Sequence, residues 1–183
     1  NWIHSNITFS PDGKEAYWAS TTTIYSKKVE DEKWVSPQVI HFSGHGTEYW
    51  YDDVPVVSPD NNKLFFLSKR QIGYASPNKE NIWFVERSSN GWSEPKQMPQ
   101  QVNSLQDIHW QISIAGNGNI YYSGGGSKIY VSRFMNGEYT GPEQLSETIN
   151  TGDLTCPFIA PDESYLIFCK ITAGIGSLHI SFK

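Results

Sequence analysis

Two segments of this sequence combine imidazole, carboxylate and large aromatic side chains, a set that could bind a ligand. Aromatic rings can stack on a sugar or a peptide side chain, and carboxylates accept hydrogen bonds from hydroxyl or ammonium groups. We predict a binding surface from these segments, with one arginine as its basic member. The predicted ligand-binding residues are His45, Glu48, Tyr49, Trp50, Asp52, Asp53, Arg70, His109 and Trp110.

A simpler role for the carboxylates is structural, because acidic residues between strands often accept hydrogen bonds from neighbouring backbone. Asp52 and Asp53 would then tie a linker to the next strand. This alternative and the binding role both stay open at the level of sequence.

Metal and nucleophile motifs are not found. His4, His45 and His109 would be the ligands of any transition-metal centre, but their spacing is not a local motif such as His-Glu-x-x-His. Ser10 and Ser58 lack the Gly-x-Ser-x-Gly elbow of a nucleophilic serine. We therefore predict no catalytic residues, no metal and no cofactor, and favour a protein that is not an enzyme.

The elements that must position these residues are four copies of a strand-turn-strand unit. Each turn precedes an aromatic-rich run, and the turns lie 48, 57 and 45 residues apart, the length of a four-stranded propeller blade. Proline presets φ, Asp or Asn accepts local hydrogen bonds, and Gly or Asn tolerates positive φ. The turns are Ser10-Pro11-Asp12-Gly13, Ser58-Pro59-Asp60-Asn61, Ala115-Gly116-Asn117-Gly118 and Ala160-Pro161-Asp162-Glu163.

A second set of residues repeats in phase with the turns. An apolar residue opens the third strand of each copy, and in three copies an aromatic residue and a proline follow at constant offsets. We predict an all-β fold of antiparallel four-stranded propeller blades, with repeats at 1–48, 49–105, 106–152 and 153–183 and no outer strand in the last. We favour a fragment of a larger propeller of about six blades over a closed four-bladed ring. The markers are Ile24, Ile82, Ile129 and Leu178, then Trp34, Trp92 and Tyr139, then Pro37, Pro95 and Pro142.

These turns and repeats resemble the WD-like β-propeller repeat with Ser-Pro-Asp-Gly turns, found in TolB-like propellers and in largely uncharacterised bacterial proteins. The resemblance covers almost the whole chain. The third turn lacks Ser and Pro, and the fourth has Glu163 in place of Gly, so we expect these two turns to be less tight.

The resemblance implies a non-catalytic module that binds a protein or glycan partner, in a periplasmic or extracellular bacterial setting. Similar propellers occur among oligosaccharide lyases, so a carbohydrate-active enzyme, a lyase or a glycoside hydrolase acting through carboxylates and histidines, is the alternative. A third possibility is the substrate-gating propeller of a larger peptidase.

Antiparallel order assigns the candidate residues to one face. Loops that join the second and third strands lie on the same face as the linkers between blades, and we call this the linker face. The insertion at about 70–81 makes this loop ten residues longer in the second repeat than in the first and third. We expect it to project over that face, with Arg70 near the acidic linker.

Charge and composition exclude several classes of partner. The net charge is −5 and the 14 Lys and Arg residues are scattered, which argues against nucleic acid. No stretch approaches the roughly 20 apolar residues of a membrane span. Cys156 and Cys169 fall on adjacent strands out of register, so we expect two buried free thiols rather than a disulfide.

Overall fold

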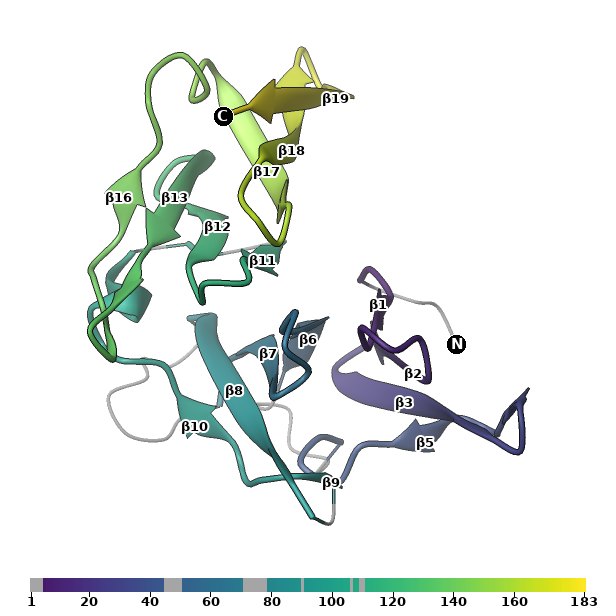
Figure 1. The fold of residues 1–183 in the computed structure, drawn as a ribbon. Helices are drawn as coiled ribbons and strands as arrows, with labels where there is room; N and C mark the ends of the chain where they lie inside the picture. The colour runs from purple at the N-terminus through teal and green to yellow at the C-terminus, as the bar shows by residue number, and fades with distance from the viewer. Residues whose placement is uncertain (1–4, 45–50, 71–78, 90, 106, 109–110) are drawn as a thin grey trace. The chain divides into compact units, whose positions relative to one another are not determined.

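The computed structural model describes residues 5–44, 51–70, 79–89, 91–105, 107–108 and 111–183. It is built almost wholly of antiparallel strands, which confirms the predicted all-β fold (Figure 1). The chain divides into two compact units, Asn1–Met98 and Pro99–Lys183, and each contains two blade-like sheets.

The first unit holds two five-stranded sheets. In each, three strands pair in chain order, and a short hairpin strand and an outer strand both pair with the third. The first sheet consists of β1 (Thr8–Phe9), β2 (Glu15–Ser20), β3 (Thr23–Glu30), β4 (Lys33–Trp34) and β5 (Gln38–Val39). The second consists of β6 (Asp52–Val57), β7 (Lys63–Ser68), β8 (Asn81–Ser88), β9 (Gly91–Trp92) and β10 (Lys96–Gln97).

The second unit repeats this plan after a single 3-10 turn, η1 (Val102–Ser104). Its first sheet contains β11 (Ile112–Ile114), β12 (Ile120–Gly124), β13 (Lys128–Ser132) and the outer strand β16 (Glu143–Gln144), and a small hairpin pairs β14 (Phe134–Met135) with β15 (Glu138–Tyr139). Its last sheet has three strands, β17 (Asp153–Ile159), β18 (Tyr165–Thr172) and β19 (Ile175–Phe182). The predicted aromatic markers end the short hairpins, and the prolines precede the outer strands.

The turns between the first two strands of each sheet close in one way. The fourth residue donates its N–H to the carbonyl of the first, at 2.8 Å for Gly13, 2.9 Å for Asn61, 3.0 Å for Gly118 and 2.8 Å for Glu163. All four closing residues have positive φ, including Glu163 at 58°. The expected loosening at Glu163 is therefore wrong, because the local hydrogen bonds hold a left-handed glutamate. The third turn is one residue shorter, since Ala115 bonds to Asn119 where Ser10 bonds to Glu15.

Each unit buries an apolar core between its two sheets. In the first unit Tyr17, Ala19 and Ile24 meet Leu64 and Phe66 of the neighbouring sheet, and in the second unit Tyr121, Ile129 and Val131 lie in one cluster with residues of β17 and β18. Buried apolar area of this kind is the main favourable term in folding. Facing apolar strands therefore hold neighbouring blades together within each unit.

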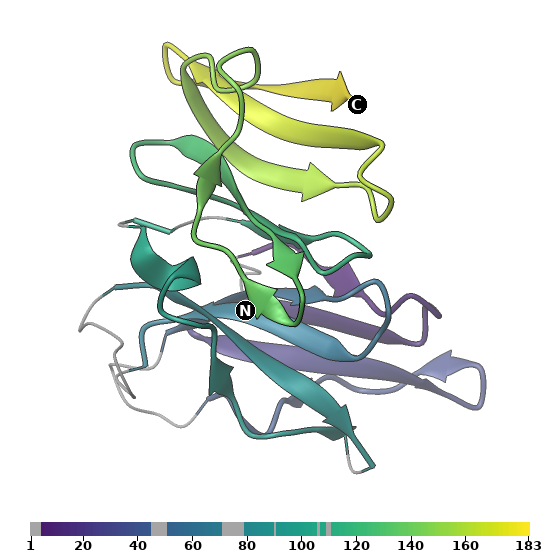
Figure 2. The same ribbon diagram turned by 60° about the vertical axis from the view of Figure 1, so that its left-hand side comes forward.

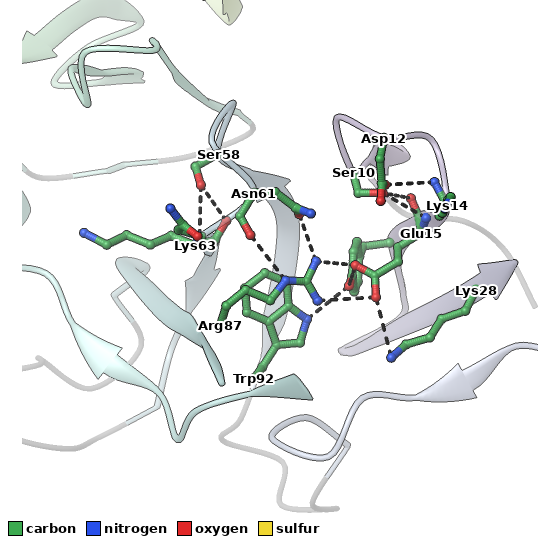
Figure 3. Close-up of polar contacts among 12 residues, drawn as sticks. Ser10, Asp12, Lys14, Glu15, Lys28, Ser58, Asn61, Lys63, Arg87 and Trp92 are labelled. Carbon is green, nitrogen blue, oxygen red and sulfur yellow. Dashed lines mark hydrogen bonds and ion pairs between the residues drawn. The ribbon is translucent and has the colours of Figure 1, made fainter. Parts of the chain in front are cut away.

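Polar contacts at the turns also join neighbouring sheets. Arg87 of β8 pairs with Glu15 of β2, lies 3.9 Å from the ring centre of Trp92, and donates to the side chain of Asn61 at 2.8 Å (Figure 3). In the second unit Glu163 accepts hydrogen bonds from Asn119 at 2.7 Å and from the Tyr121 hydroxyl at 2.9 Å. The two units thus use a glutamate for the same purpose at different repeat positions.

The innermost strands of the second and fourth sheets each carry a bulge that sequence reasoning missed. Val54 (φ 50°) and Cys156 (φ 52°) interrupt the pairing of β6 and β17, and each precedes a proline. Positive φ is unusual for a β-branched residue such as valine. The shared x-Pro dipeptide, Val54-Pro55 and Cys156-Pro157, is the signal that would have predicted the irregularity.

The cysteines are both free, as expected. Cys156 is exposed and Cys169 is partly exposed, so the prediction that both are buried is wrong. In the part of the chain that the structure describes, we find no helix with the length and apolar character needed to cross a membrane.

Candidate functional site on the linker face

In the first unit the linker face is built around a buried ion pair. Asp52 begins β6, and Arg70 follows β7 by two residues. The Arg70 Nη2 atom lies 2.7 Å from Asp52 Oδ1 and 2.8 Å from Asp52 Oδ2. The side chains are 0% and 2% exposed, so neither is available to a ligand in this conformation.

Every partner of this pair comes from the linker or from the same sheet. Ser43 donates to Asp52 Oδ2 at 2.8 Å, Ser68 donates to Asp52 Oδ1 at 2.6 Å, and Arg70 donates to the carbonyl of Phe42 at 3.3 Å. The guanidinium lies over the rings of Phe66 and Trp83, at 5.1 and 5.4 Å from their centres. The cluster therefore ties the end of the first sheet's linker to the second sheet.

Asp53 has a different environment on the other side of the strand. It is 5% exposed, accepts the N–H of Val54 at 2.8 Å and accepts the Tyr51 hydroxyl at 3.2 Å. Burial, and then the nearby Asp53 carboxylate, raise the pKa of Tyr51 well above its ordinary value. Lys69 lies 4.8 Å from the centre of the Tyr51 ring and 3.6 Å from Glu80. These contacts hold Asp53 and Tyr51 against the sheet.

In the second unit the linker face contains an open hollow of about 230 Å³. Its wall combines the loop between β12 and β13, a residue of the preceding linker and residues of the last sheet. Hydroxyl groups and one carboxylate face it together with aliphatic carbon. Its lining residues are Asp107, Ser123, Gly124, Gly126, Ser127, Leu154, Thr155 and Ile171.

The glycine-rich loop of this hollow is fixed by close contact. Gly125, Gly126 and Ser127 all have positive φ, and a Cβ on Gly125 would come within 2.7 Å of the Tyr130 hydroxyl oxygen. The carbonyl of Ser127 accepts the N–H of Leu154 at 2.8 Å. The loop therefore joins the two sheets of the unit and carries its hydroxyls to the hollow.

The predicted site residues divide into two groups. Asp52, Asp53 and Arg70 lie in the described chain, and the structure brings Asp52 and Arg70 into direct contact but buries all three. The others lie outside the described residues: His45, Glu48, Tyr49, Trp50, His109 and Trp110, together with His4. Among the residues the structure describes, no group of three or more His, Cys, Asp or Glu side chains could hold a metal ion.

Sequence reasoning missed the side chains that complete the linker connections. Ser43 accepts the N–H of Ile24 at 3.0 Å, and Asn150 accepts the N–H of Ile129 at 2.9 Å. The repeat contained a signal for the burial of Asp52, because the matching position six residues before the fourth turn is Leu154, which is 0% exposed. A charge at a core position requires a buried partner.

Neither a family model nor a curated protein matches this sequence. Several solved structures match over nearly its whole length. A putative TolB from Agrobacterium tumefaciens has a TM-score of 0.68 at 21% identity, covering 97% of this chain and 57% of that chain. TolB from Acinetobacter baumannii has a TM-score of 0.67 at 19% identity, covering 100% of this chain and 41% of that one.

A structure of a nidogen/laminin complex also matches, with a TM-score of 0.64 at 14% identity, covering 93% of this chain and 58% of that chain. At these identities the likeness shows the fold alone, and it confirms the β-propeller class. The chain spans less than two thirds of the length of the structures it matches.

Proposed function

We propose that this chain is a propeller module that binds a protein or glycan partner on its linker face, without catalysing a reaction. The observation that carries the proposal is the hollow in the second unit, where a carboxylate, hydroxyls and aliphatic carbon face one open space. Such groups suit a sugar ring or a polar side chain, with the carboxylate accepting hydroxyl or ammonium hydrogens.

The size of the hollow limits what it can hold. Its volume of about 230 Å³ is below the roughly 300–1,000 Å³ of sites that enclose a drug-sized ligand. It therefore suits one sugar residue or one side chain of a larger partner, with the rest of the partner lying across the linker face. The six predicted residues outside the described chain belong to this proposed surface.

The enzymatic alternative requires a second carboxyl group at a defined distance from the first. Asp107 is the one carboxylate among the described residues that line the hollow. A lyase or hydrolase remains a prediction for which no described pair of carboxylates supplies the geometry. Further blades, an envelope location and a partner on the linker face form one consistent proposal.

The test fills the hollow and measures binding to a panel of oligosaccharides and peptides. Thr155→Trp places a large ring in the hollow and should weaken binding of any panel member by about tenfold or more. The control is Ser181→Trp, which fills a second hollow of about 200 Å³ lined by β18 and β19 residues.

Binding that both variants reduce equally would contradict the proposal, as would a panel with no binder at all. Melting temperatures of both variants separate blocked binding from lost folding. Turnover of an oligosaccharide that Thr155→Trp abolishes would favour the enzymatic alternative instead.

A further inference from the structure

The four sheets share one structural position in their third strands. Ile24, Ile82, Ile129 and Leu178 pair with matching second-strand residues, namely Ala19, Leu67, Ser123 and Cys169. The first three isoleucines are each 0% exposed, whereas Leu178 is 80% exposed. The same apolar position is therefore covered in three sheets and open in the fourth.

An outer segment covers this position in the three sheets where it is buried. The N–H groups of Ile40, Met98 and Leu145 donate to the carbonyls of Ile24, Ile82 and Ile129, respectively, at 3.1 Å in every case. The outer segment runs antiparallel to the third strand as β5, β10 or β16. It satisfies backbone groups of the third strand and places an apolar side chain beside the isoleucine.

The three outer segments have one sequence pattern. Each reads aromatic, two residues, proline, two residues, apolar residue, and the apolar residue is the one that pairs beside the isoleucine. The proline stands at the entry to the outer strand, where a missing N–H costs least. The segments are Trp34-Val35-Ser36-Pro37-Gln38-Val39-Ile40, Trp92-Ser93-Glu94-Pro95-Lys96-Gln97-Met98 and Tyr139-Thr140-Gly141-Pro142-Glu143-Gln144-Leu145.

β19 presents the corresponding edge with no strand on it among the described residues. It is the edge strand of the last sheet (Figure 2). Lys183 donates to Ser164 beyond the end of β18, so by alternation the backbone groups of Leu178, Ile180 and Phe182 point to the free side. Their side chains are 80%, 51% and 73% exposed.

The strand also lacks the features that protect natural edges from pairing. Residues 175–182 read IGSLHISF, with no lysine, glutamate or proline. Eight residues long and apolar on one side, such an edge is a template for another strand.

We propose that the free edge of β19 accepts an extended segment of a partner protein as a fourth antiparallel strand. The recognised pattern is aromatic, two residues, proline, two residues, apolar, with the apolar residue beside Leu178. Main-chain hydrogen bonds supply the pairing, and the apolar residue sets the register. This surface differs from the hollow, and the inference stands without the proposed linker-face function.

The chain supplies its own probe peptide. A labelled synthetic peptide of residues 138–146, EYTGPEQLS, should bind the 183-residue chain saturably in fluorescence anisotropy. The matched peptide with Leu145→Asp should bind about tenfold or more weakly, because the covered apolar pair is lost. Hydrogen exchange should slow at the amides of Leu178 and Ile180 when the first peptide is bound.

Two variants of the chain locate the binding surface. Leu178→Asp should weaken peptide binding by about tenfold or more. Ile175→Asp introduces the same charge on the same strand, at a residue that is 74% exposed and projects to the other side of the sheet, and should leave binding unchanged. Because both residues are exposed, neither variant should unfold the protein, and melting temperatures check this.

Several results would overturn the proposal. The peptide might not saturate, the two chain variants might affect it equally, or exchange might slow elsewhere than at β19. A dimer in light scattering that Leu178→Asp dissociates would assign the edge to a second copy of this chain instead. Thr155→Trp, which fills the hollow, should leave peptide binding intact and so separates this test from that of the linker face.

Discussion

Two arginines of the first unit make the same set of contacts in different surroundings. Arg70 and Arg87 each pair with a carboxylate and each lie over a tryptophan ring, Trp83 at 5.4 Å and Trp92 at 3.9 Å. The Asp52–Arg70 pair is 0% and 2% exposed, whereas Glu15 and Arg87 are 14% and 24% exposed. The comparison isolates the effect of burial on one kind of interaction.

Burial changes what the pair contributes. Removing two charges from water costs several kcal/mol per ion, and the attraction between them repays this only with good geometry and additional hydrogen bonds. Asp52 and Arg70 have these bonds from Ser43, Ser68 and the Phe42 carbonyl. Their cluster therefore specifies where the linker lies more than it adds to stability, while the Glu15–Arg87 pair keeps some contact with water and carries a smaller penalty.

The largest expected effect comes from removing one member of the buried pair. Arg70→Met leaves the Asp52 carboxylate buried without its counter-charge, so we expect the free energy of unfolding to fall by about 3–5 kcal/mol. Urea denaturation followed by tryptophan fluorescence measures this. The double variant Asp52→Leu with Arg70→Met removes both charges and should be more stable than Arg70→Met alone. A double variant that is less stable would mean that the pair itself is strongly stabilising.

A smaller effect is expected at the partly exposed pair. Arg87→Met removes the hydrogen bonds to Glu15 and Asn61 and the contact with Trp92, while water can solvate the Glu15 carboxylate. We expect a loss of roughly 1–2 kcal/mol. If this loss equalled that of Arg70→Met in the same denaturation experiment, burial would not be what distinguishes the two pairs.

The Glu15 pair also predicts a pH dependence. Burial raises the pKa of Glu15, but the hydrogen bonds from Arg87 and Tyr17 outweigh it, and the net pKa lies below the ordinary value of 4.5. A lowered folded-state pKa stabilises the fold above 4.5, and that stabilisation is lost as the pH falls through the folded-state value.

Melting temperatures recorded on both sides of pH 4.5 test this dependence. Glu15→Gln cannot titrate, so its melting temperature should fall less steeply on acidification than that of the natural chain. Parallel curves for the two proteins would show that Glu15 contributes nothing to the acid response.

The smallest effect is expected from the exposed partner of the same carboxylate. Lys28 lies 3.5 Å from Glu15 and its side chain is 51% exposed. Lys28→Ala should change the free energy of unfolding by less than about 0.5 kcal/mol, and added salt should remove even that difference. A change comparable to that of Arg87→Met would indicate a contact beyond the ion pair.

The binding-site prediction shows where sequence reasoning stops. Arg70 is named correctly as the partner of the acidic linker, because the long loop after β7 and the start of β6 meet on one face. Its burial is not evident from that reasoning, since Asp52 and Arg70 read equally well as exposed charges until the repeat is aligned with Leu154. The hollow in the second unit is formed by hydroxyls and glycines that carry no motif.

Repetition let the sequence alone determine the class of fold, the four turns and the position of each third strand. A regular spacing of turn residues and apolar runs constrains local structure directly, because φ preferences and side-chain alternation act within a few residues. Tertiary structure decided which charges are buried, which isoleucines are covered and where an edge stays open. Those outcomes depend on neighbours 18 to 72 residues away, as for Arg70 with Asp52 and Arg87 with Glu15, and no local preference encodes them.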